Sequence, residues 1–308
     1  MSFDIVAIGE PMIEFNQTGQ DDGLHYLQGF GGDSSNFIIA AARQGARTGY
    51  LTALGDDAYG RMFLDLWRAE GVDSAAVKID PTAPTAVYFV THDAGGHAFH
   101  FYRTGSAASR LAPSDIDRNY VSSARVVHCS GISLAISASA CDACYTAVEA
   151  AKAAGRMVSF DTNLRLKLWP KDRARAVTTD MMSLCDICLP SYDDMLALTG
   201  IDDAEALVDF ALARGARIVA LKLGDRGAIV ASATERHHIA PFPVRAQDAT
   251  GAGDTFGGAF VARLLLGDDL ATAGRYAAVA AAISTTGFGA VAPIPRADQV
   301  KKALESGA

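Results

Sequence analysis

Short runs of Val, Ile and Leu alternate along this chain with alanine-rich segments of helical length. The apolar runs predict strands at Ile5–Gly9, Thr48–Leu54, Val126–Ser130, Met157–Asp161, Asp186–Leu189, Ile218–Leu223 and Ala228–Ser232. The segments between them predict helices at Ser35–Gln44, Gly60–Ala69, Ser139–Ala154, Arg173–Leu184, Tyr192–Thr199, Ala204–Ala213, Thr255–Leu265 and Leu270–Thr285. This alternation is typical of an α/β fold with a mainly parallel central sheet. Continuous apolar strands further indicate that helices cover both faces of the sheet.

Composition narrows the class of protein. The chain has 308 residues, 50% of them hydrophobic, and no linker or repeat divides it, so we expect a single domain spanning 1–308. A net charge of −8 argues against a nucleic-acid partner. No apolar run is long enough to span a bilayer, and the N-terminus does not resemble a signal peptide. We therefore expect a cytoplasmic protein without a membrane partner.

The chain has five cysteines, an odd number, which argues against a disulfide framework. Two pairs, Cys141/Cys144 and Cys185/Cys188, have the CxxC spacing of metal sites. Neither pair lies on a turn, however, and free cysteine is among the most buried residue types. Burial is therefore the favoured interpretation, with a zinc site and a redox role as alternatives.

Two regions, 11–28 and 85–103, depart from the α/β pattern by rough apolar/polar alternation. The second contains Asp93-Ala-Gly-Gly96, a hairpin turn signal. We interpret these regions as antiparallel strands that project from the body as a small lid, which would exclude water from a reaction. An extension of the main sheet and a dimer surface are the alternatives, and a homo-oligomer formed through the lid strands is compatible with a lid.

Asp248-Ala-Thr-Gly-Ala-Gly-Asp254 precedes an apolar helical segment that ends at Gly267. Gly251 and Gly253 permit a tight turn, and with Ala252 they place free N–H groups at a helix start, where an anion binds. A carboxylate there, Asp254, would repel a phosphate unless it takes a proton from an attacking hydroxyl. The combination indicates phosphoryl transfer to an alcohol. An ordinary glycine turn with a capping Asp is the alternative.

Two signatures in this order carry a family resemblance. Gly31-Gly-Asp-Ser-Ser-Asn36, followed by Leu54-Gly-Asp-Asp-Ala-Tyr-Gly60, resembles the N-terminal signature of the PfkB, or ribokinase-like, carbohydrate kinases, and Asp248–Asp254 resembles their C-terminal signature. The resemblance covers nearly the whole chain. It implies a ribokinase-like fold, ATP and Mg²⁺ as cofactors, and a small sugar as acceptor.

Three segments resemble 2-keto-3-deoxygluconate kinases in particular: Gly9–Phe15, Phe101–Ser109 and Asp161–Trp169. Such a substrate carries a carboxylate, which the forked donors of arginine suit. Arg103 and Arg165 are therefore predicted to bind the substrate, with surface ion pairs as the alternative.

The resemblance implies a role for each matching residue. Gly32 and Asn36 would contact substrate hydroxyls, although Asn36 is also a candidate helix cap. Tyr88 and Tyr102 would line the sugar site from the lid, with core or dimer packing as the rival interpretation. Asp254 would be the catalytic base, and it would also contact the substrate.

The nucleotide-binding residues form a separate set. Those implied are Asn163, Arg165, Ser191, Lys222, Gly224, Gly227, Gly251 and Gly253. The loop from Lys222 to Gly227 is also readable as a plain hairpin. Many ribokinase-like enzymes carry Asn-x-x-Glu where this chain has Ser191-Tyr-Asp-Asp194, so only Asp194 remains as a candidate Mg²⁺ ligand. Phosphorylation of 2-keto-3-deoxygluconate is the leading hypothesis. A kinase for fructose or a related acid, a non-catalytic sensor and a metal-bound structural protein are the others.

Overall fold

The computed structural model describes residues 2–18, 23–93 and 96–307. Its largest sheet has the strand order β15-β14-β13-β12-β11-β10-β1-β4-β6. These strands are β1 (Phe3–Ile8), β4 (Thr48–Leu51), β6 (Val72–Asp73), β10 (Ala124–Ser130), β11 (Met157–Asp161), β12 (Ile187–Cys188), β13 (Ile218–Lys222), β14 (Ala228–Ser232) and β15 (Arg236–Ile239). Strands from β6 to β13 pair in parallel, and β14 and β15 add an antiparallel edge. The predicted α/β class with a mainly parallel sheet is confirmed.

One predicted strand divides in two. The apolar run Thr48–Leu54 leaves the main sheet after Leu51, and β5 (Ala53–Gly55) pairs with β7 (Lys78–Asp80) in a separate two-stranded sheet. The break lies at Thr52, whose hydroxyl donates a 2.6 Å hydrogen bond to the Gly9 carbonyl. A β-branched residue fits either strand, so composition alone does not reveal the break.

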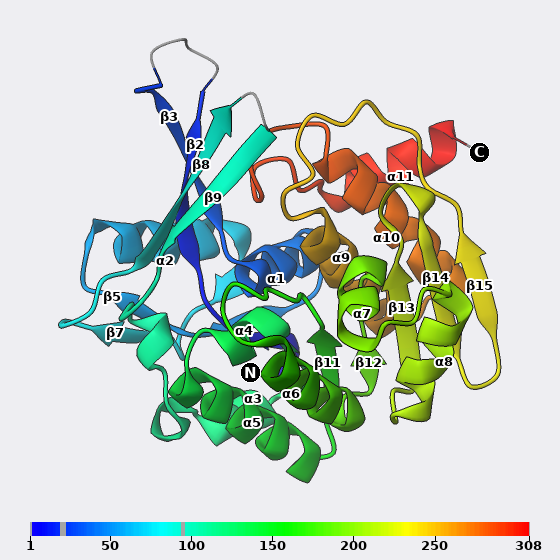
Figure 1. Cartoon of the computed structure of the whole chain (residues 1–308), viewed down its shortest axis with the longest axis horizontal. Coiled ribbons are helices and arrows are strands. Elements are labelled where there is room, and N and C mark those ends of the chain that lie inside the picture. The colour runs from blue at the N-terminus through cyan, green and yellow to red at the C-terminus, as the bar shows by residue number, and fades with distance from the viewer. Residues whose placement is uncertain (1, 19–22, 94–95, 308) are drawn as a thin grey trace.

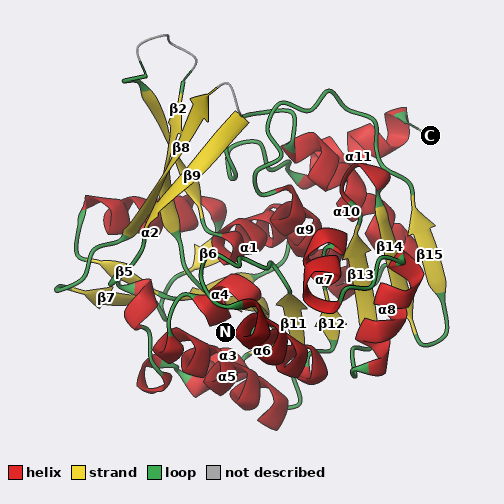
Figure 2. Ribbon diagram, in the orientation of Figure 1, coloured by secondary structure: helices red, strands yellow, loops and turns green. Residues whose placement is uncertain are grey.

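Helices cover both faces of the main sheet (Figures 1 and 2). One apolar cluster packs the sheet against α1 (Asp33–Arg43), α2 (Ala58–Glu70), α9 (Ala252–Leu266), α10 (Leu270–Ser284) and α11 (Ala297–Ser306). The other cluster lies against α3 (Arg118–Ser122), α4 (Gly131–Ala135), α5 (Ala138–Ala153), α6 (Lys171–Leu184), α7 (Tyr192–Thr199) and α8 (Ala204–Ala213). Two covered faces explain why the strands are continuously apolar.

A second sheet, of four strands in the order β3-β2-β8-β9, projects from the body at the upper left of Figure 1. Its members are β2 (Met12–Gln17), β3 (Tyr26–Gly31), β8 (Ala86–Asp93) and β9 (Gly96–Tyr102). The β2–β3 and β8–β9 pairs are antiparallel, while β2 and β8 run parallel. Asp93 pairs with Gly96, although residues 94–95 of the expected turn lie outside the described part of the chain.

Helices α1 and α9 pack unusually closely because α9 presents glycine to α1. A Cβ on Gly258 would lie 2.3 Å from the Phe37 carbonyl oxygen, and one on Gly257 would lie 3.2 Å from the Phe37 ring. No side chain larger than hydrogen fits at Gly258 without moving the backbone of α1. This close approach brings the start of α9 beside the start of α1.

The five cysteines are buried and free. Cys141 and Cys144 lie within α5, Cys185 ends α6 and Cys188 lies in β12. Burial raises the pKa values of Cys129 and Cys144, which opposes thiolate formation. Over residues 2–18, 23–93 and 96–307, no helix combines the length and the apolar character that crossing a membrane requires.

Candidate active site

A cavity of about 820 Å³ lies beneath the four-stranded sheet, at the carboxyl ends of several main strands. That edge of an open α/β sheet is where ligands bind. The cavity is lined by twelve of the predicted site residues: Gly32, Asn36, Tyr88, Asn163, Arg165, Ser191, Asp194, Lys222, Gly224, Gly251, Gly253 and Asp254. Residues from both ends of the chain therefore meet in one place.

A second cavity, of about 520 Å³, adjoins the first and is lined mainly by apolar side chains, among them Phe242, Val244 and Phe256. Two predicted residues that do not line the first cavity, Gly227 and Ala252, line this one. Lys222, Gly224 and Gly253 line both cavities. The arrangement gives a polar chamber and an apolar chamber that meet at one shared wall.

The start of α9 forms that shared wall. Gly251 precedes the helix with a φ of +75°, in the left-handed region that glycine adopts without strain. The helix then begins at Ala252, so the first N–H groups and the positive end of the helix dipole face the cavities. This geometry suits an anion shared between the two chambers.

Asp254 lies in the first turn of α9 and is held from α1. Its Oδ2 accepts a 2.8 Å hydrogen bond from Nδ2 of Asn36. Asn36 is not the cap of α1, because that position belongs to Gly32, so the capping interpretation is wrong. The Oδ1 atom of Asn36 is buried and has no donor among the described residues. A buried acceptor without a donor fits a ligand hydroxyl at this position.

Gly32 is required by the backbone at the same point. Its φ of +100° lies in the left-handed region, and a Cβ there would lie 2.2 Å from the Glu10 carbonyl oxygen. The chain can therefore pass from β3 into α1 beside the cavity only with glycine at this position.

The environment of Asp254 suits proton transfer. Burial, and then the nearby Asp33 carboxylate, raise its pKa to about 7, against the opposing effects of Asn36 and Lys222. A carboxyl group with a pKa near neutrality exchanges protons effectively with a hydroxyl at physiological pH. A buried carboxylate with a pKa near neutrality, beside the start of α9, meets the requirements of general-base chemistry.

Lys222 supplies a cation at the shared wall. Its Nζ pairs with Asp161 at the end of β11 and lies 3.5 Å from where a Cβ on Gly253 would be. Burial raises the pKa of Asp161, and Lys222 opposes that shift. The loop from Lys222 to Gly227 is both a hairpin between β13 and β14 and a lining of both cavities, so the two interpretations are compatible.

The four-stranded sheet presents Tyr88 to the cavity, but it turns Tyr102 away. Tyr88 is directly opposite Phe101 in the β8–β9 ladder, so Phe101 shares its face and Tyr102 lies on the other face. Phe101 lines the cavity, whereas Tyr102 is 66% exposed and packs edge-on against Phe89. The prediction for Tyr102 is corrected: Phe101 occupies the expected place.

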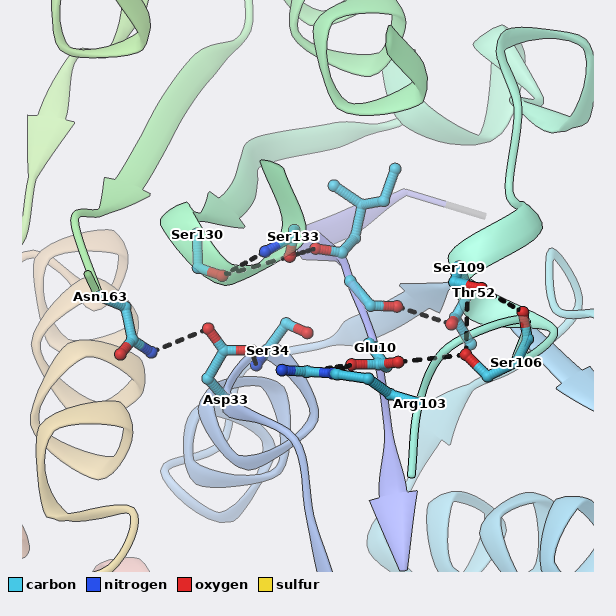
Figure 3. A network of polar contacts seen from close by, with 12 residues as sticks. Glu10, Asp33, Ser34, Thr52, Arg103, Ser106, Ser109, Ser130, Ser133 and Asn163 are labelled. Atoms are coloured by element: carbon cyan, nitrogen blue, oxygen red, sulfur yellow. Dashed lines mark hydrogen bonds and ion pairs between the residues drawn. The ribbon is translucent and has the colours of Figure 1, made fainter. Parts of the chain in front are cut away.

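Arg103 also differs from expectation. The residue is 8% exposed and does not line the cavity. Its Nε donates a 2.8 Å hydrogen bond to the buried carboxylate of Glu10, which also accepts from Ser106 (Figure 3). The structure therefore assigns Arg103 to an internal ion pair at the base of the four-stranded sheet, because the buried Glu10 needs a cation.

Comparisons with known proteins agree with this geometry. The family model described as pfkB family carbohydrate kinase matches residues 2–297. The chain belongs to this family. It is 37% identical to the 2-dehydro-3-deoxygluconokinase of Thermoproteus tenax, covering 97% of this chain and 94% of the relative. It is 33% identical to fructokinase-2 of Solanum habrochaites, covering 99% and 97%.

A solved structure extends the comparison to three dimensions. An E. coli protein in complex with ATP and Mg²⁺ superposes with a TM-score of 0.91 at 29% identity, covering 99% of each chain. The ribokinase-like fold of this PfkB carbohydrate kinase is thereby confirmed.

The residues present in this PfkB kinase also fit a magnesium ion that shares its ligands with phosphates. Mg²⁺ in such sites is usually held by one or two carboxylates together with phosphate oxygens. Asp194 lines the cavity, and its Oδ2 accepts from Thr162 and from the Leu164 N–H, which leaves Oδ1 for a ligand. Ser191 caps α7 and so positions Asp194. The described residues include no cluster of three or more His, Cys, Asp or Glu side chains arranged to hold a metal alone.

Several lining residues of this PfkB kinase were not predicted as site residues. Asp33 and Asp161 line the first cavity, as do Phe99 and Phe101, and the segment Pro241–Val244 lines the second. Asp33 and Asp161 both stand inside sequence segments that carry the family resemblance, and that position was the available signal. Nothing in the local pattern indicates the apolar segment, because it has no regular secondary structure.

Proposed function

We propose that this carbohydrate kinase phosphorylates 2-keto-3-deoxygluconate at its primary hydroxyl, with ATP and Mg²⁺, and releases the 6-phosphate and ADP. The observation that carries the proposal is the pair of exposed cations, Arg165 and Lys167, on the loop after β11. Both line the polar cavity, and neither forms an ion pair with a carboxylate of the described chain. A sugar acid would supply that carboxylate, while a neutral sugar has no carboxylate to offer either cation.

The chemistry follows from the geometry around α9. Asp254 takes the proton of the sugar's primary hydroxyl while the hydroxyl oxygen bonds to the γ-phosphorus. The bond between the γ-phosphorus and the β-phosphate oxygen breaks, and its electrons leave with ADP. Free N–H groups at the start of α9 and the Lys222 ammonium stabilise the charge on the transferring group. Bound Mg²⁺ would neutralise the phosphates. Adenine fits the apolar chamber, and the four-stranded sheet acts as a lid that excludes water.

The substrate class is tested by ADP release with Mg²⁺-ATP and a panel of acceptors. The panel contains 2-keto-3-deoxygluconate, its galactonate epimer, fructose, ribose and gluconate. We expect turnover with the keto-deoxy acids. Fructose is the second candidate because fructokinases are among the relatives. Turnover confined to fructose or ribose would overturn the proposed substrate and keep the kinase.

The role of Arg165 gives a sharper result. Arg165→Met should lower kcat/KM for the acid about 10- to 100-fold, since it removes charge-assisted hydrogen bonds to the substrate. Turnover of any neutral sugar should change far less. Arg173→Met, an exposed arginine on α6 outside both cavities, is the matched control. Equal losses on acid and neutral substrates would instead assign Arg165 to the nucleotide.

Lys222 should matter for every acceptor. Lys222→Met is expected to lower kcat about 10²-fold or more, because it removes a cation from the transferring phosphoryl group. Steady-state rates with saturating ATP measure the effect, and Lys171→Met, exposed at the start of α6, is the control. A change in KM for ATP with kcat intact would place Lys222 in nucleotide binding alone.

A further inference from the structure

Asp33 is a buried carboxylate of the reaction centre to which the proposed chemistry gives no task. It is the first residue of α1, lines the polar cavity and is only 9% exposed. Its Oδ1 accepts a 2.8 Å hydrogen bond from the Ser34 N–H, and its Oδ2 accepts one of 2.8 Å from Nδ2 of Asn163 (Figure 3). Among the described residues no Lys or Arg pairs with it. A buried charge without a counter-ion is destabilising, so its retention calls for an explanation.

Asn163 holds Asp33 in a fixed direction. It is the one described residue other than glycine with a positive φ, at +28°. Its backbone N–H donates a 3.2 Å hydrogen bond to Asp161, which anchors it at the end of β11. Backbone strain of this kind persists where the surrounding structure imposes it, often at functional sites. Here the strained turn directs the Asn163 amide at Asp33.

Asp33 acts at the same point as Asp254. Asp33 and Asn36 lie three residues apart in the first turns of α1, so they share one face of the helix. Asn36 donates to Asp254, and all three side chains line the same cavity. The negative charge of Asp33 therefore lies beside the carboxylate that receives the proton.

We propose that Asp33 is a positioning residue for phosphoryl transfer: its buried carboxylate, held by Ser34 and Asn163, is a fixed negative charge beside Asp254. The inference rests on the proposed kinase activity. In this inference the hydrogen bond from Asn163 keeps the Asp33 carboxylate in place, so that the proton from the acceptor hydroxyl settles on Asp254. Asp33 itself exchanges no proton with the substrate.

The charges around Asp254 support this assignment. Its pKa is raised to about 7 by burial, next by Asp33 and then by Asp161, while Asn36 and Lys222 lower it. Tyr88 faces Asp254 from the four-stranded sheet, and Glu10 and Tyr50 lie near Asp33. Of the charged side chains, Asp33 is the strongest influence. A base with greater proton affinity takes a proton more readily, provided that it is ionised at the working pH.

The test is the pH dependence of kcat/KM for the best acceptor between pH 5 and 9. The unaltered enzyme should lose activity below a midpoint near the Asp254 pKa of about 7, because protonated Asp254 accepts no proton. Asp33→Asn should move that midpoint down by about one pH unit, since removing a like charge favours the ionised form of Asp254. It should also lower the plateau rate, because a base with weaker proton affinity takes a proton less readily. Asp193→Asn, which removes an exposed carboxylate from the mouth of the same cavity, should displace the midpoint by less than about 0.3 units because water screens that charge.

Two further measurements separate the possible failures. Asp33→Ser also removes the charge, so it should give the same displacement, and thermal unfolding identifies a variant that fails to fold. A carbon-13 NMR titration of the Asp254 carboxyl in the unaltered protein and in Asp33→Asn needs no substrate. A lower NMR midpoint in the variant supports the inference, whether or not any sugar on the panel turns over. Absence of turnover with every sugar would refute the proposed function alone. An unchanged midpoint in both the kinetic and the NMR titrations overturns it.

Discussion

Asp254→Asn is expected to lower kcat about 10²- to 10⁴-fold, because the substitution removes the proposed base for the acceptor proton. The replacement has nearly the same shape and still offers an oxygen to Nδ2 of Asn36, so the cavity wall should remain intact. Affinities for ATP and sugar, measured by calorimetry, should stay within a few-fold of the unaltered values. A selective loss of kcat would mark an interaction made in the transition state.

The same experiment has a pH signature. Because Asp254 has a pKa of about 7, the unaltered enzyme should gain activity as pH rises through neutrality and should level off above it. The residual rate of Asp254→Asn should not rise with pH through neutrality in this way. Asp172→Asn, an exposed carboxylate on α6, is the matched control. A variant that kept more than a tenth of the activity at pH 8 would show that the proton leaves by another route.

Arg103→Met is expected to reduce the free energy of unfolding by about 3–5 kcal/mol, because it leaves the fully buried Glu10 without its cation. The hydrogen bond from Ser106 remains but carries no charge. Chemical denaturation measures the loss. Arg110→Met, which breaks a partly exposed pair with Asp80, should change stability by less than about 1 kcal/mol. The double variant Glu10→Gln with Arg103→Met should recover part of the loss.

The loss in Arg103→Met should depend on pH in a defined direction. Burial already raises the pKa of Glu10, and removing Arg103 raises it further. A carboxyl group with a raised folded-state pKa binds its proton more tightly when folded, so its contribution to stability falls as pH rises above its unfolded pKa of about 4.5. The variant should therefore be closer to normal at pH 5 than at pH 8. Unchanged stability with a raised KM for the sugar acid would return Arg103 to the substrate role.

The sequence predicted the parts of this protein that local chemistry determines. The start of α9 follows from its glycines, and its end at Gly267 follows from the left-handed conformation there. Residues that lie after strands, such as Asn163 and Lys222, follow from the α/β order, which brings the carboxyl ends of parallel strands together.

The sequence could not predict what depends on pairing between distant segments. Whether Tyr102 or Phe101 faces the cavity is decided by the register of β8 with β9, and a shift of one residue exchanges the two faces. The partner of Arg103, Glu10, lies 93 positions away and carries no local signal. Strand β15 was missed because it is a short edge strand, Arg236–Ile239, without an apolar run.

The close packing of α1 on α9 also has a consequence for synthesis of the chain. Asn36 and Asp254 are separated by 218 positions, so a ribosome completes α1 long before it reaches α9. Until then the nascent chain lacks Asp254, the proposed base, and Phe37 lacks the cover that Gly257 of α9 gives it in the completed protein. Translation that stops before α9 should therefore yield chains without kinase activity. Such chains expose the apolar face of α1, and we expect chaperones to bind them or proteases to degrade them.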